Sequence, residues 1–213
     1  MYVPTTPRIV GLGDSLINQS QREHQMLDQI SDLIQLSLRT PFVQLFDIGL
    51  NNQPIAKIRS RLRWLIDLLL PDAVLLYFGS DCDVDETLLS ATEVLDLRLA
   101  YRRNLGFVLT HLQRRARYVV VTGPTLMGEL PHGQNAKDGM LDAYRNMTRA
   151  AAVKRGIDYI DSRAAFFAAL PRGWAQRSGH LTGDGQHLNA RGAALVARLV
   201  AEPLSAWLAR PPT

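Results

Sequence analysis

Two short motifs near opposite ends of the chain hold residue types that could together perform nucleophilic catalysis. One is Gly13–Leu16, which spells GDSL, and the other is Asp184–His187, which spells DGQH. A serine at a tight strand-to-helix turn can expose its hydroxyl as a nucleophile and point its backbone N–H at a developing oxyanion. A carboxylate three positions before a histidine can bind the imidazole Nδ1 on a turn and leave Nε2 facing a serine. The two motifs therefore predict a catalytic triad of Ser15, His187 and Asp184.

The motifs are evidence for catalysis only if the surrounding strands and helices fit, because Gly-Asp-Ser also occurs in ordinary turns. Five short runs are apolar on both faces, as expected for strands buried in a parallel sheet. They cover residues 8–13, 42–47, 73–78, 118–122 and 159–161. Helical periodicity follows Pro54, runs from Leu95 to Leu112 and from Leu141 to Ala151, and follows Asn189, which suits an N-cap. The buried faces expected for the second and the last of these helices include Leu95, Leu99, Leu105, Val108 and Leu112, and Leu195, Leu199 and Trp207.

Strands that alternate with helices predict an α/β fold. The expected architecture is a three-layer α/β/α sandwich with a five-stranded, mostly parallel sheet of the flavodoxin-like kind. A chain of 213 residues suits one core, so residues 1–213 are expected to form a single domain. Ligands of such folds bind beyond the carboxyl ends of the strands. Ser15 follows the first strand directly, which places it at that edge.

A strand-ending GDSL combined with an Asp-x-x-His just before the final helix resembles the SGNH (GDSL) hydrolase family. The resemblance covers nearly the whole chain and implies the SGNH hydrolase fold. It also implies hydrolysis of a carboxylic ester through an acyl-enzyme on Ser15, with His187 as the base, Asp184 orienting it, and no cofactor. The implied partner is a small-molecule ester with a small acyl or acetyl group, or a thioester.

The oxyanion hole is where the sequence departs from the family. A glycine of the family is replaced by Asn52, whose backbone N–H can still donate, and a side-chain donor asparagine is replaced by Asp81. An ionised carboxylate cannot donate, and losing one oxyanion donor costs on the order of 100- to 1000-fold in rate. The hole is assigned to Ser15, Asn52 and Asp81. Three outcomes stay open: a protonated Asp81, an amide of Asn51 or Asn52 as the replacement donor, or a site that binds without hydrolysing.

Two long loops after strands, residues 123–138 and 171–183, are expected to overhang the site. The candidate substrate-binding residues are Asp14, Gly49, Asn51 and Trp174. The loops are too short to form a deep lipid tunnel, so small, polar esters are the expected substrates. Two other functions stay open: an acyltransferase that uses the same triad, and a catalytically weakened binding protein with the same fold.

The composition argues against several other classes of protein. The formal net charge is +4, but the arginine clusters lack interleaved aromatic residues, so no nucleic-acid partner is expected. No uncharged apolar run reaches 18 residues, so no stable membrane association is expected. The single Cys82 excludes an internal disulfide, and the acidic string over 81–86 lacks the glycine of a calcium loop, so no metal is expected. No signal peptide is recognisable, which predicts a cytoplasmic protein. The oligomeric state stays open.

Overall fold

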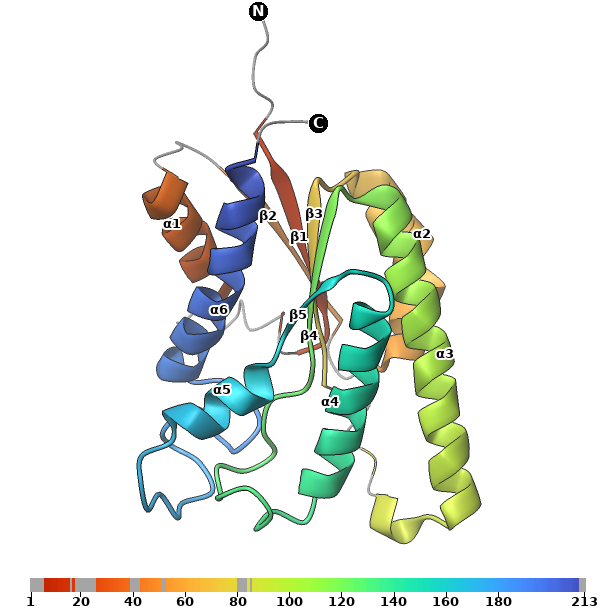
Figure 1. Cartoon of the computed structure of the whole chain (residues 1–213), viewed down its shortest axis with the longest axis vertical. Helices are drawn as coiled ribbons and strands as arrows, with labels where there is room; N and C mark the ends of the chain where they lie inside the picture. The colour runs from red at the N-terminus through yellow and green to blue at the C-terminus, as the bar shows by residue number, and fades with distance from the viewer. Residues whose placement is uncertain are drawn as a thin grey trace, which may run out of the picture.

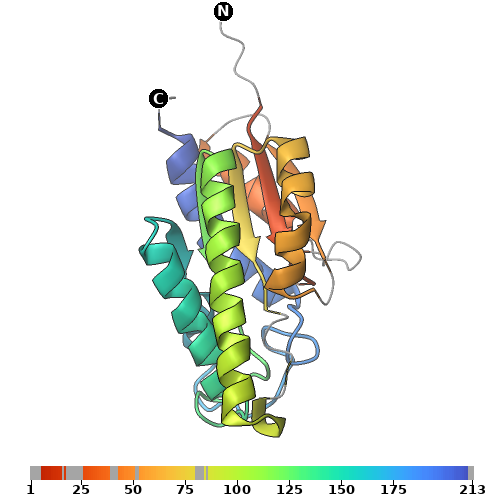
Figure 2. The same ribbon diagram turned by 90° about the vertical axis from the view of Figure 1, so that its right-hand side faces the viewer.

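The computed structural model describes residues 6–15, 17, 26–38, 43–50, 53–79, 84 and 86–210. A five-stranded sheet forms the middle layer, and helices cover both of its faces (Figures 1 and 2). The strands are β1 (Arg8–Gly13), β2 (Gln44–Gly49), β3 (Ala73–Tyr77), β4 (Tyr118–Thr122) and β5 (Asp158–Ile160). Their spatial order is β2-β1-β3-β4-β5, and every neighbouring pair is parallel. The predicted three-layer α/β sandwich is confirmed.

The helices divide into two sets, one on each face of the sheet (Figure 1). One set consists of α1 (Met26–Leu38), α5 (Ser162–Ala169) and α6 (Ala190–Leu208), and the other of α2 (Ile55–Leu69), α3 (Ala91–Arg115) and α4 (Asp138–Val153). Alternate residues of a strand serve the two apolar layers, with Ile9 in one and Val10 in the other. Strands that are buried on both faces appear as unbroken apolar runs, and this holds for β1, β3 and β4. The same burial was expected for β2 and β5, but they form the two edges of the sheet and contain no fully buried residue.

The structure corrects the sequence predictions at several elements. The second strand begins at Gln44, where it pairs with Arg8, and runs to Gly49, two residues beyond the predicted end. Phe42, the predicted start, lies outside the described residues. The periodicity did not predict α1 or α5. Pairing with β1 sets the ends of β2, and a local apolar run does not contain that information.

The buried faces of α3 and α6 also differ from the prediction. Leu95 and Leu99 are 56% and 49% exposed, because the first turns of the 25-residue α3 extend past the carboxyl edge of the sheet (Figure 2). The rest of the predicted α3 face is buried, namely Leu105, Val108 and Leu112. In α6 the predicted Leu195, Leu199 and Trp207 are only partly buried. The face of α6 that is fully buried comprises Ala193, Val196, Ala197, Val200 and Leu204. Within the described residues, no helix is both long and apolar enough to cross a bilayer.

Candidate active site

The carboxyl ends of the three adjacent strands β2, β1 and β3 meet at Gly13. This residue pairs with Gly49 on one side and with Tyr77 on the other. A Cβ atom at Gly13 would lie 1.7 Å from the carbonyl oxygen of Tyr77, so only glycine fits where β1 and β3 converge. Ser15 follows two residues later and is partly exposed. The first motif therefore lies at the edge of the sheet where ligands of this fold bind.

Asp14 fixes the turn that presents Ser15. Its side chain is 1% exposed, and its Oδ2 accepts a 2.6 Å hydrogen bond from the backbone N–H of Gly79, just past β3. The N–H of Ile17 donates to the Asp14 carbonyl at 3.1 Å, which closes the turn. Asp14 therefore ties the turn of Ser15 to the end of β3. Its substrate-binding role stays a prediction.

Asp184 and His187 form the hydrogen-bonded pair that their spacing predicts. The imidazole Nδ1 lies 2.7 Å from Asp184 Oδ2, and Asp184 Oδ1 accepts from the backbone N–H groups of Gln186 at 3.0 Å and His187 at 2.7 Å. Burial acts to raise the pKa of Asp184, but the hydrogen bonds from His187 and Gln186 outweigh it and lower that pKa to about 2. An ionised carboxylate can only accept, so Nδ1 is the donor, and a neutral ring then leaves Nε2 as an acceptor.

A short hairpin just before α6 carries this pair. Thr182 and Leu188 form an isolated antiparallel bridge, and the N–H of Gly183 donates to the carbonyl of His187 at 2.9 Å. Asn189 caps α6, as predicted, and its side chain accepts from the N–H groups of the first helical turn at 2.9 and 3.1 Å. The chain therefore turns within a few residues, and this turn brings the aspartate back to the histidine.

The two motifs line one small cavity. Its wall includes Ser15 and Gln186, the residue that precedes His187, together with Gly79 and residues 124–127 of the loop after β4. The cavity has a volume of about 10 Å³. The structure therefore brings the GDSL turn and the loop of the Asp184–His187 pair to the same place, although they lie at opposite ends of the sequence.

The other predicted site residues have different outcomes. Asn51, Asn52 and Asp81 lie outside the described residues. Gly49 ends β2 at the site edge, and its N–H donates to Asp47 Oδ1 at 2.8 Å. Trp174 packs its ring 5.2 Å from that of His180, and its buried indole Nε1 has no hydrogen-bond partner in the part of the chain that the structure describes. The binding roles of these residues stay predictions.

A second, larger cavity adjoins the first and has a volume of about 330 Å³. Met127 and Gln186 line both cavities. The remaining wall of the larger one includes four polar or charged residues. It comprises Gly128, Asn135, Ala136, Lys137, Arg177, Asp184 and Gly185. The two long loops, residues 123–138 and 171–183, therefore contribute to this wall.

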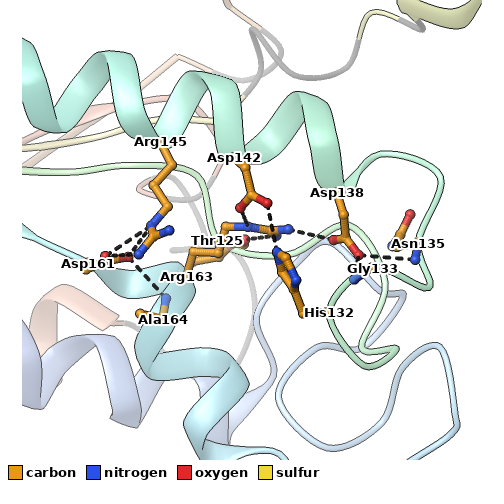
Figure 3. Close-up of polar contacts among 10 residues, drawn as sticks. All are labelled: Thr125, His132, Gly133, Asn135, Asp138, Asp142, Arg145, Asp161, Arg163 and Ala164. Carbon is orange, nitrogen blue, oxygen red and sulfur yellow. Dashed lines mark hydrogen bonds and ion pairs between the residues drawn. The ribbon is translucent and has the colours of Figure 1, made fainter.

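A buried arginine that is not among the predicted site residues supports the first of these loops (Figure 3). Arg163 of α5 is 1% exposed and donates to Asp138 at 2.6 Å, to Asp142 at 2.8 Å and to the carbonyl of Thr125 at 3.0 Å. Asp138 in turn accepts from the N–H groups of Gly133 and Asn135. Thr125 lines the cavity at Ser15, so Arg163 holds part of the cavity wall. An arginine within an alanine-rich helix gives no sequence signal of this role.

Comparison with known proteins places this architecture among acylhydrolases. The sequence model of the GDSL-like Lipase/Acylhydrolase family matches residues 12–195. No curated protein matches the chain. Among solved structures, the acetyl xylan esterase AlAXEase is 24% identical, with 92% of this chain and 99% of that chain covered and a TM-score of 0.79.

Two further solved structures share the fold. The acetylxylan esterase Axe2 from Geobacillus stearothermophilus is 16% identical over 95% of each chain, with a TM-score of 0.78. LAE5, an alpha/beta hydrolase enzyme from the metagenome of Lake Arreo, Spain, is 18% identical over 99% of this chain and 100% of that chain, with a TM-score of 0.75. At these identities the similarity demonstrates a common fold over almost the entire chain.

Proposed function

Because this chain belongs to the GDSL-like Lipase/Acylhydrolase family and is therefore an esterase, we propose that it cleaves a small acyl ester through an acyl-enzyme on Ser15. The observation that carries the proposal is the cavity that Ser15 shares with Gln186, next to His187. A nucleophile, a base and a carboxylate that orients the base are the three parts that acyl transfer by serine needs.

In the proposed reaction, Ser15 Oγ attacks the ester carbonyl carbon while Nε2 of His187 accepts the hydroxyl proton. The tetrahedral intermediate collapses, the alcohol leaves, and the imidazolium gives that alcohol the proton. Water then attacks acyl-Ser15 with His187 again as base, the carboxylic acid leaves, and the proton returns to Ser15 Oγ. Asp184 stays ionised because its pKa is about 2, so it stabilises the imidazolium in both halves of the reaction.

The similar structures support this assignment of the triad. Three structures of Axe2 carry a substitution of a serine, an aspartate or a histidine, and each is described as a catalytic mutant. The aspartate precedes the histidine by three positions in Axe2, which is also the spacing of Asp184 and His187. Both proteins therefore have an Asp-x-x-His on the same fold.

For the oxyanion hole we retain the predicted donors, namely the backbone N–H groups of Ser15 and Asn52 and the side chain of Asp81. The N–H of Gly79 does not join them, because it donates to Asp14. A carboxylic acid kept neutral in an apolar pocket can donate a hydrogen bond, so Asp81 is compatible with catalysis when protonated.

The two cavities favour an acetyl ester of a hydroxyl-rich alcohol. A volume of about 10 Å³ holds about one water molecule, which suits the methyl group of an acetyl. The 330 Å³ cavity presents Asn135, Lys137 and Arg177, which can hydrogen-bond the hydroxyl groups of a sugar. AlAXEase and Axe2 are described as acetyl xylan esterases, which agrees with an acetylated sugar as the substrate class.

The proposal is tested by comparing wild type with Ser15→Ala. Wild type should label with a fluorophosphonate, hydrolyse 4-nitrophenyl acetate faster than 4-nitrophenyl octanoate, and release acetate from an acetylated xylo-oligosaccharide. Ser15→Ala should do none of these while keeping the same circular dichroism spectrum. Product analysis with an added alcohol acceptor detects acyl transfer in place of hydrolysis. Labelling of folded Ser15→Ala at the wild-type rate would refute the role of Ser15.

A further inference from the structure

Glu129, in the loop after β4, is a buried carboxylate that the proposed reaction does not use. Its side chain is 0% exposed. Oε2 accepts from the N–H of His180 at 2.9 Å, and Oε1 accepts from the N–H groups of Leu181 at 2.7 Å and Thr182 at 2.5 Å and from the Thr182 hydroxyl at 2.6 Å. Four donors therefore converge on one carboxylate.

These donors alone compensate the charge of Glu129 among the described residues, because no lysine, arginine or histidine there forms an ion pair with it. Burial acts to raise the pKa of Glu129, but the hydrogen bonds from residues 180–182 outweigh it and lower the pKa. The group is thus ionised at neutral pH. A buried carboxylate would be costly without such donors, so the geometry of residues 180–182 and the charge of Glu129 depend on each other.

The donors are the first residues of the hairpin that carries the Asp184–His187 pair. Thr182 forms the bridge to Leu188 that closes this hairpin. The Thr182 hydroxyl also accepts from the N–H of Gly185 at 3.2 Å while it donates to Glu129. Glu129 is therefore connected to the backbone between Asp184 and His187 through a single side chain.

The backbone next to Glu129 joins the same hairpin. The N–H of Gly128 donates to the carbonyl of Gly185 at 2.6 Å, and the N–H of Glu129 donates to the carbonyl of Arg177 at 2.9 Å. Gly185 has a φ of +92°, and a Cβ there would lie 3.1 Å from the Arg177 carbonyl. The loop after β4 and the hairpin thus meet closely, with Glu129 at the centre of the contact.

We propose that Glu129 is a positioning residue that holds the Asp184–His187 pair in register with Ser15. It touches neither of the two cavities, and it acts through Thr182 and the closed hairpin. The inference rests on the proposed function for its effect on rate, but its effect on the Asp184–His187 hydrogen bond is independent of that function. Displacing a catalytic group by about 1 Å costs on the order of 100-fold in rate.

The test uses Glu129→Gln, with Glu129→Asp as the conservative variant and Glu202→Gln on the exposed side of α6 as the matched control. Glutamine keeps the shape, but its NH₂ group would face an N–H donor. We expect kcat for 4-nitrophenyl acetate to fall about 10- to 100-fold in Glu129→Gln, with KM changed less than about 3-fold. Glu129→Asp should recover part of the loss, and Glu202→Gln should match wild type.

A second readout is the downfield proton resonance of His187 Nδ1–H, assigned by its loss in Asp184→Asn. It should shift or broaden in Glu129→Gln at a temperature where circular dichroism shows the variant folded. If both the resonance and kcat stay at the wild-type values in folded Glu129→Gln, the positioning role is refuted. A shifted resonance in a protein whose wild type hydrolyses no ester would support the positioning role and refute the proposed function. If Glu129→Gln does not fold, the positioning role is tested by measuring kcat and the His187 Nδ1–H resonance in Glu129→Asp.

Discussion

The buried ion pairs of Arg163 give a stability prediction whose size follows from the structure. Replacing Arg163 by methionine removes its hydrogen bonds to Asp138, Asp142 and Thr125 at once. Asp138 is 5% exposed and would keep only its two backbone donors, so one carboxylate would be left buried without its cation. Asp142 would keep His132, which lies 2.7 Å away.

Breaking a buried ion pair from one side costs about 3–5 kcal/mol, because the remaining charge is uncompensated. We expect Arg163→Met to lose that much free energy of unfolding, which lowers Tm by roughly 6–20 °C for a chain of this size. The pair of Arg145 with Asp161 is the matched control (Figure 3). The side chains of Arg145 and Asp161 are 26% and 28% exposed, so water can solvate the charge that Arg145→Met leaves behind, and this variant should cost less than Arg163→Met.

Urea unfolding followed by circular dichroism measures both variants against wild type. The double variant Arg163→Met, Asp138→Asn should be more stable than Arg163→Met alone, because it removes the orphaned charge. If Arg163→Met costs no more than Arg145→Met, the reasoning from buried charge is wrong. The esterase activity of folded Arg163→Met should also fall, since Thr125 lines the cavity at Ser15.

Four further outcomes are expected. Asp184→Asn should lower kcat for 4-nitrophenyl acetate by about 10⁴-fold with an unchanged fold, and wild-type turnover would show that this carboxylate has no orienting role. If an ionised Asp81 carboxylate hampers the oxyanion hole, Asp81→Asn should raise the rate of ester hydrolysis at neutral pH by about 10-fold. Equal rates for Asp81→Asn and wild type at every pH from 5 to 9 would contradict that. Gly13→Ala should be destabilised by more than about 1–3 kcal/mol, whereas Gly139→Ala, which has open space, should not be, and equal Tm values would refute the close approach of β1 and β3. Folding lowers the pKa values of both Glu129 and Asp184. The two carboxylates therefore stabilise the folded protein at pH values above their unfolded pKa values, and this contribution is lost as the pH falls from about 4.5 towards 2. Urea unfolding should show that the free energy of unfolding falls less between pH 5 and pH 3 in Glu129→Gln than in wild type.

Features that depend on neighbouring residues alone could be predicted from the sequence. Strands β1, β3 and β4 are buried on both faces, so each appears as an unbroken apolar run. The spacing of Asp184 and His187 allows a hydrogen bond within one turn, and the structure contains that bond. Asn189 caps α6 because its side chain satisfies N–H groups only two and three residues away. The GDSL motif lies at the end of a strand, so the position of Ser15 at the carboxyl edge of the sheet also follows from neighbouring residues.

Contacts between residues far apart in the sequence could not be predicted, because they depend on how the elements pack against one another. The ends of β2 depend on pairing with β1, and the exposure of Leu95 depends on how far α3 extends past the sheet. Glu129 and Arg163 gave no signal in the sequence, because a charged residue in a loop or helix is usually solvated. Their burial follows from donors and acceptors that lie 51–53 residues away for Glu129 and 21–38 residues away for Arg163. Hydrophobic periodicity covers about one turn or one strand, so it contains no record of such contacts.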